Sequence, residues 1–553
     1  MMEDLEAGIT RWPAELEKAY VEAGYWENRS LGEQIFAVAD QFPDRSALTD
    51  PNTGLEVTFA QLCQRADATA ARLLALGFKP GDRAIIALPN TASFIILLLG
   101  MLRASILPVL ALPSHRHFEL KTLALTSGAR AYIASDVVRG CDHRELAKRL
   151  QAEVPNLEMI IIEGEPRAGQ LDLMEILAPP TPAEITPLRQ RFDALDPAAD
   201  QPALFLLSGG TTGVPKLIVR THNDYVYNVK ASLKVNEFTE SDVFLAVMPI
   251  SHNFPLACPG VLGALLVGAK TVITSSPNPV KVFPIIAEYG VTHTALVPAV
   301  AQSWIDHQHH NHTHDLGSLK TLQVGGSRMP DSLAIKINGV LGAHLQQVFG
   351  MAEGLINMTR LNDPEVVINT TQGRPISPAD EIRVVDEHFK DVKPGEEGEI
   401  LTRGPYTPRG YFAAPEANAK SFHDGWYGSG DIVHRRPDGN LVVHGRNKDI
   451  INRGGEKISA EEVESFIYYI EGVSRAAVVA MPHPILHEDI CLVVELVGRH
   501  ELTVSEVTDH LDAFGVARFK HPAKIIVVDH IPMTKIDKID KKTLRDFVAS
   551  QLK

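Results

Sequence analysis

The stretch that decides the fold reads Ser208-Gly209-Gly210-Thr211-Thr212-Gly213-Val214-Pro215-Lys216. It directly follows an apolar run at 203–207, which is typical of a buried strand. The glycines allow a tight turn that brings backbone N–H groups close to an anion, and three hydroxyls and a lysine add donors and charge. We interpret the stretch as a loop that holds nucleotide phosphates rather than a flexible linker, because a linker rarely follows a buried strand directly. It is not a Walker loop, since Gly-x-x-x-x-Gly-Lys-Ser/Thr cannot be aligned with it.

Length and composition narrow the class of protein. The 553 residues exceed one ordinary hydrophobic core and predict two or more domains. A net charge of -15 argues against a nucleic-acid binder but leaves room for local basic sites that handle phosphates. The four widely spaced cysteines form no Cys-x-x-Cys pair, which indicates neither a disulfide scaffold nor a zinc site. Because the acidic N-terminus also lacks the features of a signal peptide, the sequence predicts a cytoplasmic protein.

The most apolar stretch, 94–113, predicts a buried helix followed by a strand. It is interrupted by Arg103 and Pro108, and its unbroken apolar run, 94–102, is far shorter than a bilayer span. We therefore expect no insertion into a membrane.

Short apolar runs alternate with helical patterns from about residue 30 to 450, which predicts parallel sheets covered by helices. The predicted strands are 83–88, 243–247, 271–274, 293–297, 319–324 and 345–349, and the predicted helices are 283–289, 299–307 and 331–340. After about residue 380, strands at 399–402 and 440–443 indicate a smaller, partly antiparallel region. Past residue 445 the pattern is that of a small α+β domain, with helices near 460–470 and 504–514 and strands at 476–480, 491–496 and 525–528.

Two carboxylates stand in glycine-rich turns. Glu353 lies in the stretch 347–354 just past a predicted strand, where it could hold a Mg²⁺ carried in with nucleotide phosphates or simply be solvated. Asp431 ends the turn Gly428-Ser429-Gly430-Asp431, where it could accept hydrogen bonds from both ribose hydroxyls or only stabilise the turn.

Charged segments complete the set of motifs. The stretches 445–449 and 453–457 lie at the expected domain boundary and fit either a hinge or an ordinary linker. The basic stretch 532–542 fits a solvated tail when taken alone. The histidine-rich run 307–314 could bind a transition metal, but we favour a solvated helix end and loop.

The order and spacing of these motifs resemble the adenylate-forming superfamily of acyl-CoA synthetases, nonribosomal-peptide adenylation domains and luciferases. The resemblance covers about residues 30 to 545. It implies an α/β fold, with a large N-terminal domain of helix-covered mixed β-sheets plus a small barrel-like region. A small mobile α+β domain carrying the catalytic lysine follows. The implied domains are 1–447 and 448–553.

The resemblance also implies roles for individual residues in a two-step reaction with ATP and Mg²⁺. A carboxylate would attack the α-phosphate to give an acyl-adenylate, and a thiol would then displace AMP. Lys538 is the implied catalytic lysine, Lys448 the hinge, Gly455 the lining of a pantetheine tunnel and Glu353 the Mg²⁺ ligand. The implied nucleotide-binding residues are Ser208, Gly209, Gly210, Thr211, Thr212, Gly213, Lys216, Gly326, Phe349, Gly350, Asp431 and Arg446. Of these, Thr211, Thr212 and Lys216 would handle the β/γ-phosphates, Phe349 would stack on adenine beside Gly326, and Asp431 and Arg446 would bind the ribose side.

Three positions depart from the common family pattern. Gly210 replaces one residue of the Ser-Gly-Thr-Thr-Gly-x-Pro-Lys signature, and Asp537 stands where most members have Gly before the catalytic lysine. Ala352 stands where many have Thr, a feature shared with the aryl-acid ligases of siderophore biosynthesis.

The segment 249–260 resembles the acid pocket of that aryl-acid branch. Amino-acid-activating relatives place an Asp where this chain has Asn253, and a neutral amide suits a substrate without an amine and can hydrogen-bond an ortho hydroxyl. Phe254 would supply an aromatic wall, and His252 would lie at the pocket entrance. The implied substrate-binding residues are His252, Asn253, Phe254, Cys258, Gly325, Val348, Met351 and Ile356. A loop with buried apolar residues and no ligand is the plain alternative.

Cys258 distinguishes two substrates. Branch members that activate 2,3-dihydroxybenzoate are expected to have Ser here, and salicylate-activating members Cys. A Ser hydroxyl can satisfy a 3-hydroxyl, whereas a thiol is bulkier and bonds weakly. Ile356 narrows the same space, so we favour salicylate over 2,3-dihydroxybenzoate.

The expected acceptor is the phosphopantetheine thiol of a separate aryl carrier protein. The chain ends soon after Lys538 without the Asp-Ser signature of a carrier domain. Alternatives are a benzoate-type CoA ligase, a catalytically silent adenylate-binding regulator and a luciferase-like monooxygenase. Retention of Lys538, Glu353 and Asp431 argues against the regulator.

Overall fold

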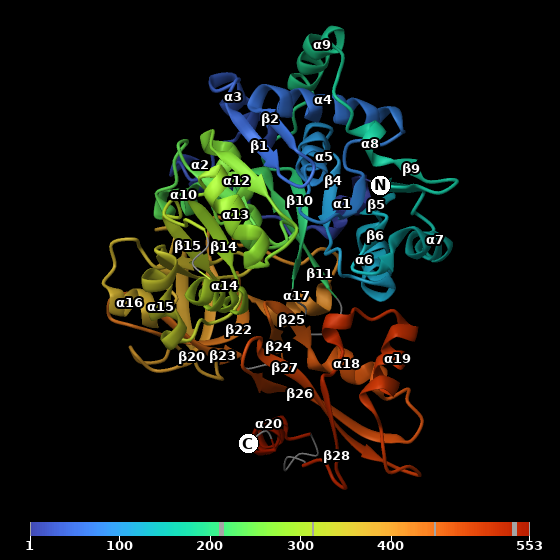
Figure 1. The fold of residues 1–553 in the computed structure, drawn as a ribbon, viewed down its shortest axis with the longest axis vertical. Coiled ribbons are helices and arrows are strands. Elements are labelled where there is room, and N and C mark those ends of the chain that lie inside the picture. Colours follow the sequence, from blue (N-terminus) through green and yellow to red (C-terminus); the bar gives the residue numbers. More distant parts are fainter. Residues whose placement is uncertain (1, 209–214, 312–313, 447–449, 533–538, 552–553) are drawn as a thin grey trace.

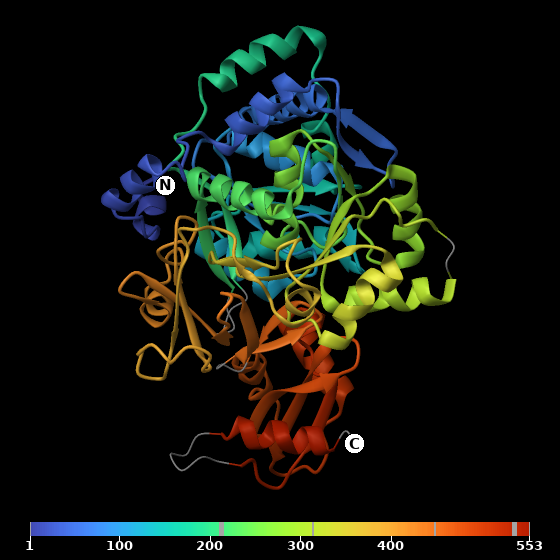
Figure 2. The ribbon, with the colours of Figure 1, turned by 90° about the vertical axis from the view of Figure 1, so that its left-hand side faces the viewer.

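The computed structural model describes residues 2–208, 215–311, 314–446, 450–532 and 539–551. Figures 1 and 2 show a large lobe up to residue 446 and a smaller lobe from residue 450 onward. The helices are α1 (Met2–Gly8), α2 (Ala14–Glu22), α3 (Leu31–Gln41), α4 (Phe59–Ala75), α5 (Ala92–Arg103), α6 (His117–Ser127), α7 (His143–Glu153), α8 (Leu173–Ile176), α9 (Pro182–Asp193), α10 (His222–Asn236), α11 (Asn253–Ala257), α12 (Gly260–Val267), α13 (Pro279–Tyr289), α14 (Pro298–Asn311), α15 (Asp331–Leu341), α16 (Glu365–Thr370), α17 (Pro415–Ser421), α18 (Ala460–Ile467), α19 (Val504–Phe514) and α20 (Lys541–Ser550).

Two sheets form the centre of the large lobe. One has the order β18 (Arg374–Pro375), β17 (Ile356–Met358), β16 (His344–Gly350), β15 (Thr321–Val324), β14 (His293–Leu296), β12 (Val243–Ala246), β13 (Lys270–Ile273), β1 (Ser46–Asp50) and β2 (Leu55–Thr58). The other has the order β11 (Lys216–Thr221), β10 (Pro202–Ser208), β4 (Leu107–Leu110), β3 (Arg83–Ala87), β5 (Ala131–Ser135), β8 (Met159–Glu163) and β9 (Leu171–Asp172). Their interiors are parallel, and antiparallel strands close their edges at β2, β11, β17 and β18. The predicted strands of this region are confirmed to within a few residues.

The hydrophobic core between the two sheets is continuous. It includes Phe94 of α5, Leu204 of β10 and Val261 of α12, all of which are buried. Residues 94–113, predicted to be a helix and a strand, form α5 and β4. Among the described residues, no helix is both long enough and apolar enough to span a bilayer.

Two smaller sheets follow along the chain. The first contains β19 (Glu381–Val385), β20 (Gly398–Arg403), β22 (Trp426–Arg435), β21 (Phe422–His423) and β23 (Leu441–Arg446). All its pairs are antiparallel, where the sequence predicted a partly antiparallel region. The second contains β25 (Glu456–Ser459), β24 (Ile450–Arg453), β27 (His487–Leu496), β26 (Val473–His483) and β28 (Lys524–Val527). A short hairpin joins β6 (Val137–Val138) to β7 (Cys141–Asp142).

Two parts of the small lobe differ from a plain reading of the sequence. The strands predicted at 476–480 and 491–496 extend into one long hairpin of β26 and β27, because their cross-strand partners continue past the apolar runs. Of the stretch 532–542, which alone fits a solvated tail, the described residues from Ile539 onward lead into α20. That helix is capped by Asp540, and Leu544 and Val548 are buried against β26 and β27. The α+β class predicted for this lobe is confirmed.

Candidate active site

A cavity of about 210 Å³ lies between the two lobes. On the side of the large lobe it is lined by the end of β10, by most residues of the segment 248–258 and by the turn between β16 and β17. On the side of the small lobe it is lined by residues 454–457, Glu462, Phe519 and Lys520. The carboxyl ends of parallel strands meet here, which is where ligands bind in open α/β sheets.

The predicted acid pocket forms one end of this cavity. Its lining includes His252, Asn253, Phe254, Cys258, Val348, Met351 and Ile356. Gly325 lies directly behind it, because a Cβ at Gly325 would come within 3.2 Å of the Phe254 ring and 2.8 Å of the Val348 carbonyl oxygen. A glycine at position 325 therefore lets the aromatic wall pack onto strand β16.

Hydrogen bonds fix the Asn253 side chain at the start of α11. Its Oδ1 accepts a hydrogen bond from the Tyr225 hydroxyl at 2.9 Å, and its Nδ2 faces the Cys258 Sγ at 3.6 Å. The Cys258 thiol in turn donates to the Asn253 carbonyl oxygen at 3.5 Å. Burial raises the pKa of Cys258 to about 12, so the thiol is neutral and is a weak hydrogen-bonding group at the pocket wall.

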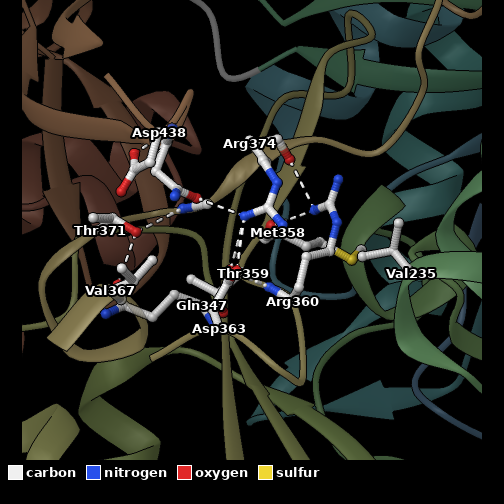
Figure 3. Close-up of polar contacts among 12 residues, drawn as sticks. Val235, Gln347, Met358, Thr359, Arg360, Asp363, Val367, Thr371, Arg374 and Asp438 are labelled. Atoms are coloured by element: carbon white, nitrogen blue, oxygen red, sulfur yellow. Dashed lines mark hydrogen bonds and ion pairs between the residues drawn. The ribbon is translucent and has the colours of Figure 1, made fainter. Parts of the chain in front are cut away.

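The turn that carries Glu353 is built by an antiparallel pair. Gly350 of β16 pairs with Ile356 of β17, and the Met351 N–H donates to the Leu355 carbonyl at 3.2 Å. A hydrogen-bonded network behind this pair (Figure 3) contains an ion pair between Arg374 and Asp363. The strand pairing and the Met351–Leu355 hydrogen bond hold β16 and β17 in register, and Gly350, Met351 and Ile356 all line the cavity.

Tyr411 links two charged groups that the sequence assigns to phosphates and metal. Its hydroxyl donates to Glu353 Oε1 at 2.9 Å, and Lys216 Nζ lies 4.9 Å from its ring centroid. Burial and then the charge of Glu353 raise the pKa of Tyr411 well above its usual value, so it remains a donor. No motif identified Tyr411, because its role depends on a contact across 58 residues of chain.

The residues predicted to bind ribose are brought together by strand pairing. Asp431 of β22 pairs directly with Arg446 of β23, and the Asp431 N–H donates to the Ser429 hydroxyl at 3.1 Å. Asp431 is buried, but neither it nor Phe349 lines the cavity. Their nucleotide roles therefore stay predictions.

The hairpin of β24 and β25 forms the opposite wall. Gly455 has a φ of +97°, and a Cβ on it would lie 2.7 Å from Val297 Cγ1. The Asn452 Nδ2 donates to the Gly326 carbonyl at 2.9 Å, and His252 Nε2 lies 3.8 Å from Glu456 Oε1. The structure thus places Gly455 beside Gly326 and places the half-exposed His252 at the seam between the lobes. The role of His252 at a pocket entrance stays a prediction.

A buried ion cluster joins the lobes next to the cavity. Lys520 Nζ lies 2.6 Å from Glu462 Oε1 and 3.0 Å from Glu119 Oε1, and Glu119 also accepts a hydrogen bond from the Ala517 N–H at 3.1 Å. Burial raises the pKa of Glu462 to about 7, although Lys520 opposes the shift. Sequence reasoning missed this cluster, since Glu119 is about 400 residues from its partner.

Several predicted residues lie outside the described ranges, and their roles stay predictions: Gly209, Gly210, Thr211, Thr212, Gly213, Lys448 and Lys538. The described residues on either side of Lys538 pack on one face of the small lobe. Ile531 and Ile539 contact the face of β26 and β27 that α20 covers, whereas α18 covers the other face. Figure 1 shows α20 at the end of the small lobe farthest from the large lobe.

Residues 307–311 of the histidine-rich run form the end of α14, the helix end expected from the sequence, and residues 312–313 lie outside the described ranges. Its described residues His309 and His310 are exposed, and no cluster of metal-binding side chains occurs among the residues that the structure describes.

Comparison with known proteins identifies the family. The family described as "AMP-binding enzyme" matches residues 35–412, and "AMP-binding enzyme C-terminal domain" matches residues 462–538. A Streptomyces protein named salicylyl-CoA synthase / salicylate adenylyltransferase is 47% identical, with 98% of each chain covered. The salicyl-AMP ligase / salicyl-S-ArCP synthetase of Mycobacterium tuberculosis is 44% identical, with 97% of this chain and 94% of that protein covered. The apo structure of MbtA from Mycobacterium smegmatis superposes with a TM-score of 0.74 at 44% identity, covering 98% of this chain and 99% of that one. The chain therefore belongs to the AMP-binding enzymes and is an adenylate-forming ligase of the aryl-acid branch.

Proposed function

We propose that this enzyme uses ATP to convert salicylate into salicyl-adenylate and then transfers the acyl group to the phosphopantetheine thiol of an aryl carrier protein, a step of siderophore biosynthesis. The observation that carries the proposal is the acid pocket, in which a neutral amide, an aromatic ring and a buried thiol stand together at one end of the cavity.

The pocket favours an aryl acid over an amino acid. A carboxylate would be needed to pair with an ammonium group, and Asn253 offers none. Phe254, Val348 and Ile356 give apolar walls for a benzene ring. Beside them, Cys258 offers a 3-hydroxyl only a weak partner, and leaving such a hydroxyl unpaired costs roughly 1–3 kcal/mol. This supports salicylate ahead of 2,3-dihydroxybenzoate.

In the first step, a carboxylate oxygen of the acid attacks the α-phosphorus of ATP, the bond to the β-phosphate breaks and pyrophosphate leaves. Lys216 and the preceding loop would hold the β/γ-phosphates, and Lys538 would stabilise the charge that develops on the α-phosphate. The Glu353 carboxylate, buried and oriented by Tyr411, suits Mg²⁺, which prefers oxygen ligands. When bound, that ion would neutralise phosphate charge.

In the second step, a thiolate sulfur attacks the acyl carbon, a thioester forms and AMP leaves. Gly455 would leave room for the pantetheine arm beside Val297, where a side chain would collide. Ile531 and Ile539, the described residues that flank this part of the chain, pack on the face of the small lobe opposite α18, whose Glu462 lines the cavity. We therefore propose that residues 448–553 rotate about Lys448 between the two steps.

A second candidate differs only in the acceptor. One relative is named a salicylyl-CoA synthase and another a salicyl-S-ArCP synthetase, so free CoA is the alternative thiol. Thioester formation with CoA, compared with a phosphopantetheinylated aryl carrier protein at equal concentration, separates the two.

ATP–pyrophosphate exchange tests the activation step. We expect the highest kcat/KM with salicylate in a panel that also contains 2,3-dihydroxybenzoate, benzoate and several amino acids. Best activity with any amino acid would refute the aryl-acid assignment. Best activity with 2,3-dihydroxybenzoate would refute only the argument from Cys258.

A further inference from the structure

The Asn253 amide is held in one orientation by a residue that does not line the cavity. Tyr225, on α10, is buried, and its hydroxyl donates to Asn253 Oδ1 at 2.9 Å. This leaves the Nδ2 group of Asn253 turned toward Cys258 Sγ, and both residues line the cavity. The pocket therefore presents a donor, not an acceptor, at this position.

The direction of the Tyr225 bond follows from hydrogen-bond satisfaction. Among the described residues, the Tyr225 hydroxyl has no other hydrogen-bond partner than Asn253. If the amide were reversed, the Tyr225 oxygen would accept from Nδ2 and its own proton would be buried without an acceptor. Such a buried unpaired group is unfavourable. Burial also raises the pKa of Tyr225 far above neutrality, so the hydroxyl keeps its proton.

Tyr225 is itself held rigidly. The Arg220 guanidinium lies 4.7 Å from the Tyr225 ring centroid and is ion-paired with Asp224 at 2.6 Å. Asp224 in turn caps the first turn of α10 through Thr221. These groups are fully or almost fully buried, so the ring cannot swing away from Asn253 without breaking the start of the helix.

We propose that Tyr225 is a positioning residue that sets which ortho substituent the pocket accepts: it favours aryl acids with an ortho acceptor and disfavours those with an ortho donor. This inference rests on the proposed function.

The chemistry of the two substrate classes gives the reason. In salicylate, the ortho hydroxyl donates its single proton to the neighbouring carboxylate, so its oxygen can only accept from the protein. In 2-aminobenzoate, one N–H bonds to the carboxylate and the other points outward as a donor. A fixed Asn253 Nδ2 satisfies the first arrangement and opposes the second, because two donors would face each other.

Tyr225→Phe removes the constraint on the amide and tests the proposal. With ATP–pyrophosphate exchange as readout, we expect kcat/KM for salicylate to fall about 5-fold and that for 2-aminobenzoate to rise by a similar factor, the value of one hydrogen bond. Benzoate, which has no ortho group, should change less than about 2-fold. Opposite changes for two substrates cannot come from a general loss of structure.

Tyr227→Phe is the matched control. Tyr227 lies on the same helix and is also buried, but its hydroxyl bonds to Ser377 Oγ at 2.7 Å instead of Asn253. It should leave the ratio of salicylate to 2-aminobenzoate unchanged.

A second variant covers the case in which Tyr225→Phe fails to fold. Asn253→Asp keeps one oxygen for Tyr225 and turns an acceptor toward the ligand, so it should favour 2-aminobenzoate with Tyr225 in place. If the wild type activates salicylate but neither variant shifts the ratio, this inference is refuted and the proposed function stands. If the wild type activates no benzoate at all, the proposed function fails and the inference falls with it.

Discussion

The two ends of the cavity are built in different ways. The acid pocket is enclosed within the large lobe, where Tyr225, Asn253 and Cys258 form a closed set of buried hydrogen bonds. The opposite wall is a hairpin of the small lobe that meets the large lobe through the Asn452–Gly326 bond, the contact of Gly455 with Val297 and a buried ion cluster. The acid pocket, built within one lobe, can keep a constant shape around the substrate. The opposite wall, contributed by the small lobe, can be replaced by another face of that lobe between the two steps. A substitution in the acid pocket should therefore change substrate choice without impairing acyl transfer, and a substitution in the hairpin should do the reverse.

The largest effect is expected from removing Lys538, the cation proposed for the first step. Lys538→Ala should reduce ATP–pyrophosphate exchange by several orders of magnitude, because the charge that develops on the α-phosphate loses its cation. Thioester formation from preformed salicyl-adenylate should continue, since pyrophosphate is no longer being displaced. Both half-reactions are measured in the same preparation. Equal loss of both would contradict a role for Lys538 in the first step alone.

The ion cluster gives the seam between the lobes a pH dependence. Burial raises the pKa of Glu462 from 4.5 to about 7, so the folded protein binds this proton more tightly than the unfolded chain does. Its contribution to stability is complete below about pH 4.5 and is lost as the pH rises through 7. Relative to Glu462→Gln, the wild type should lose up to about 3 kcal/mol of unfolding free energy between pH 5 and pH 8. Urea unfolding of both proteins at each pH measures the difference, and parallel pH profiles would rule out this role for Glu462.

A bulky residue at position 455 should affect the second step alone. Gly455→Leu places a Cβ against Val297 and should slow transfer to the carrier by about 10–100-fold while exchange stays nearly intact. Gly498→Leu is the control, because Gly498 also has a positive φ, +76°, but has open space around it. If both variants slow transfer equally, backbone strain and not crowding at Val297 is the cause.

The smallest effect is expected from a substitution in the acid pocket. Cys258→Ser should raise kcat/KM for 2,3-dihydroxybenzoate relative to salicylate. The change in the ratio should correspond to the free energy of one hydrogen bond, about 1 kcal/mol. Cys258→Ala, which adds space without a hydroxyl, separates volume from hydrogen bonding. A ratio that does not move in the Ser variant would mean that Cys258 does not face the 3-position of the ring.

Local patterns predicted the elements better than their pairing. The strands of the large lobe and the turn at Glu353 could be located because apolar runs and glycines act over a few residues. The turn predicted at 428–431 is wrong, because these residues lie within strand β22, whose partners β20 and β23 are distant from the local glycine pattern. The antiparallel edges of the sheets and the full length of the β26–β27 hairpin could not be located, since they depend on partners distant in the chain.

By itself, the sequence determined the α/β class, the order of the motifs and the chemistry of the acid-pocket segment, because those depend on residue type and short spacing. The tertiary structure alone decided that Tyr225 orients Asn253, that Tyr411 joins Lys216 to Glu353, and that Glu119, Lys520 and Glu462 close the seam. Each of these depends on burial and on contact between segments that lie apart along the chain. Hydrogen-bond direction and pKa are set by such surroundings, which no local motif encodes.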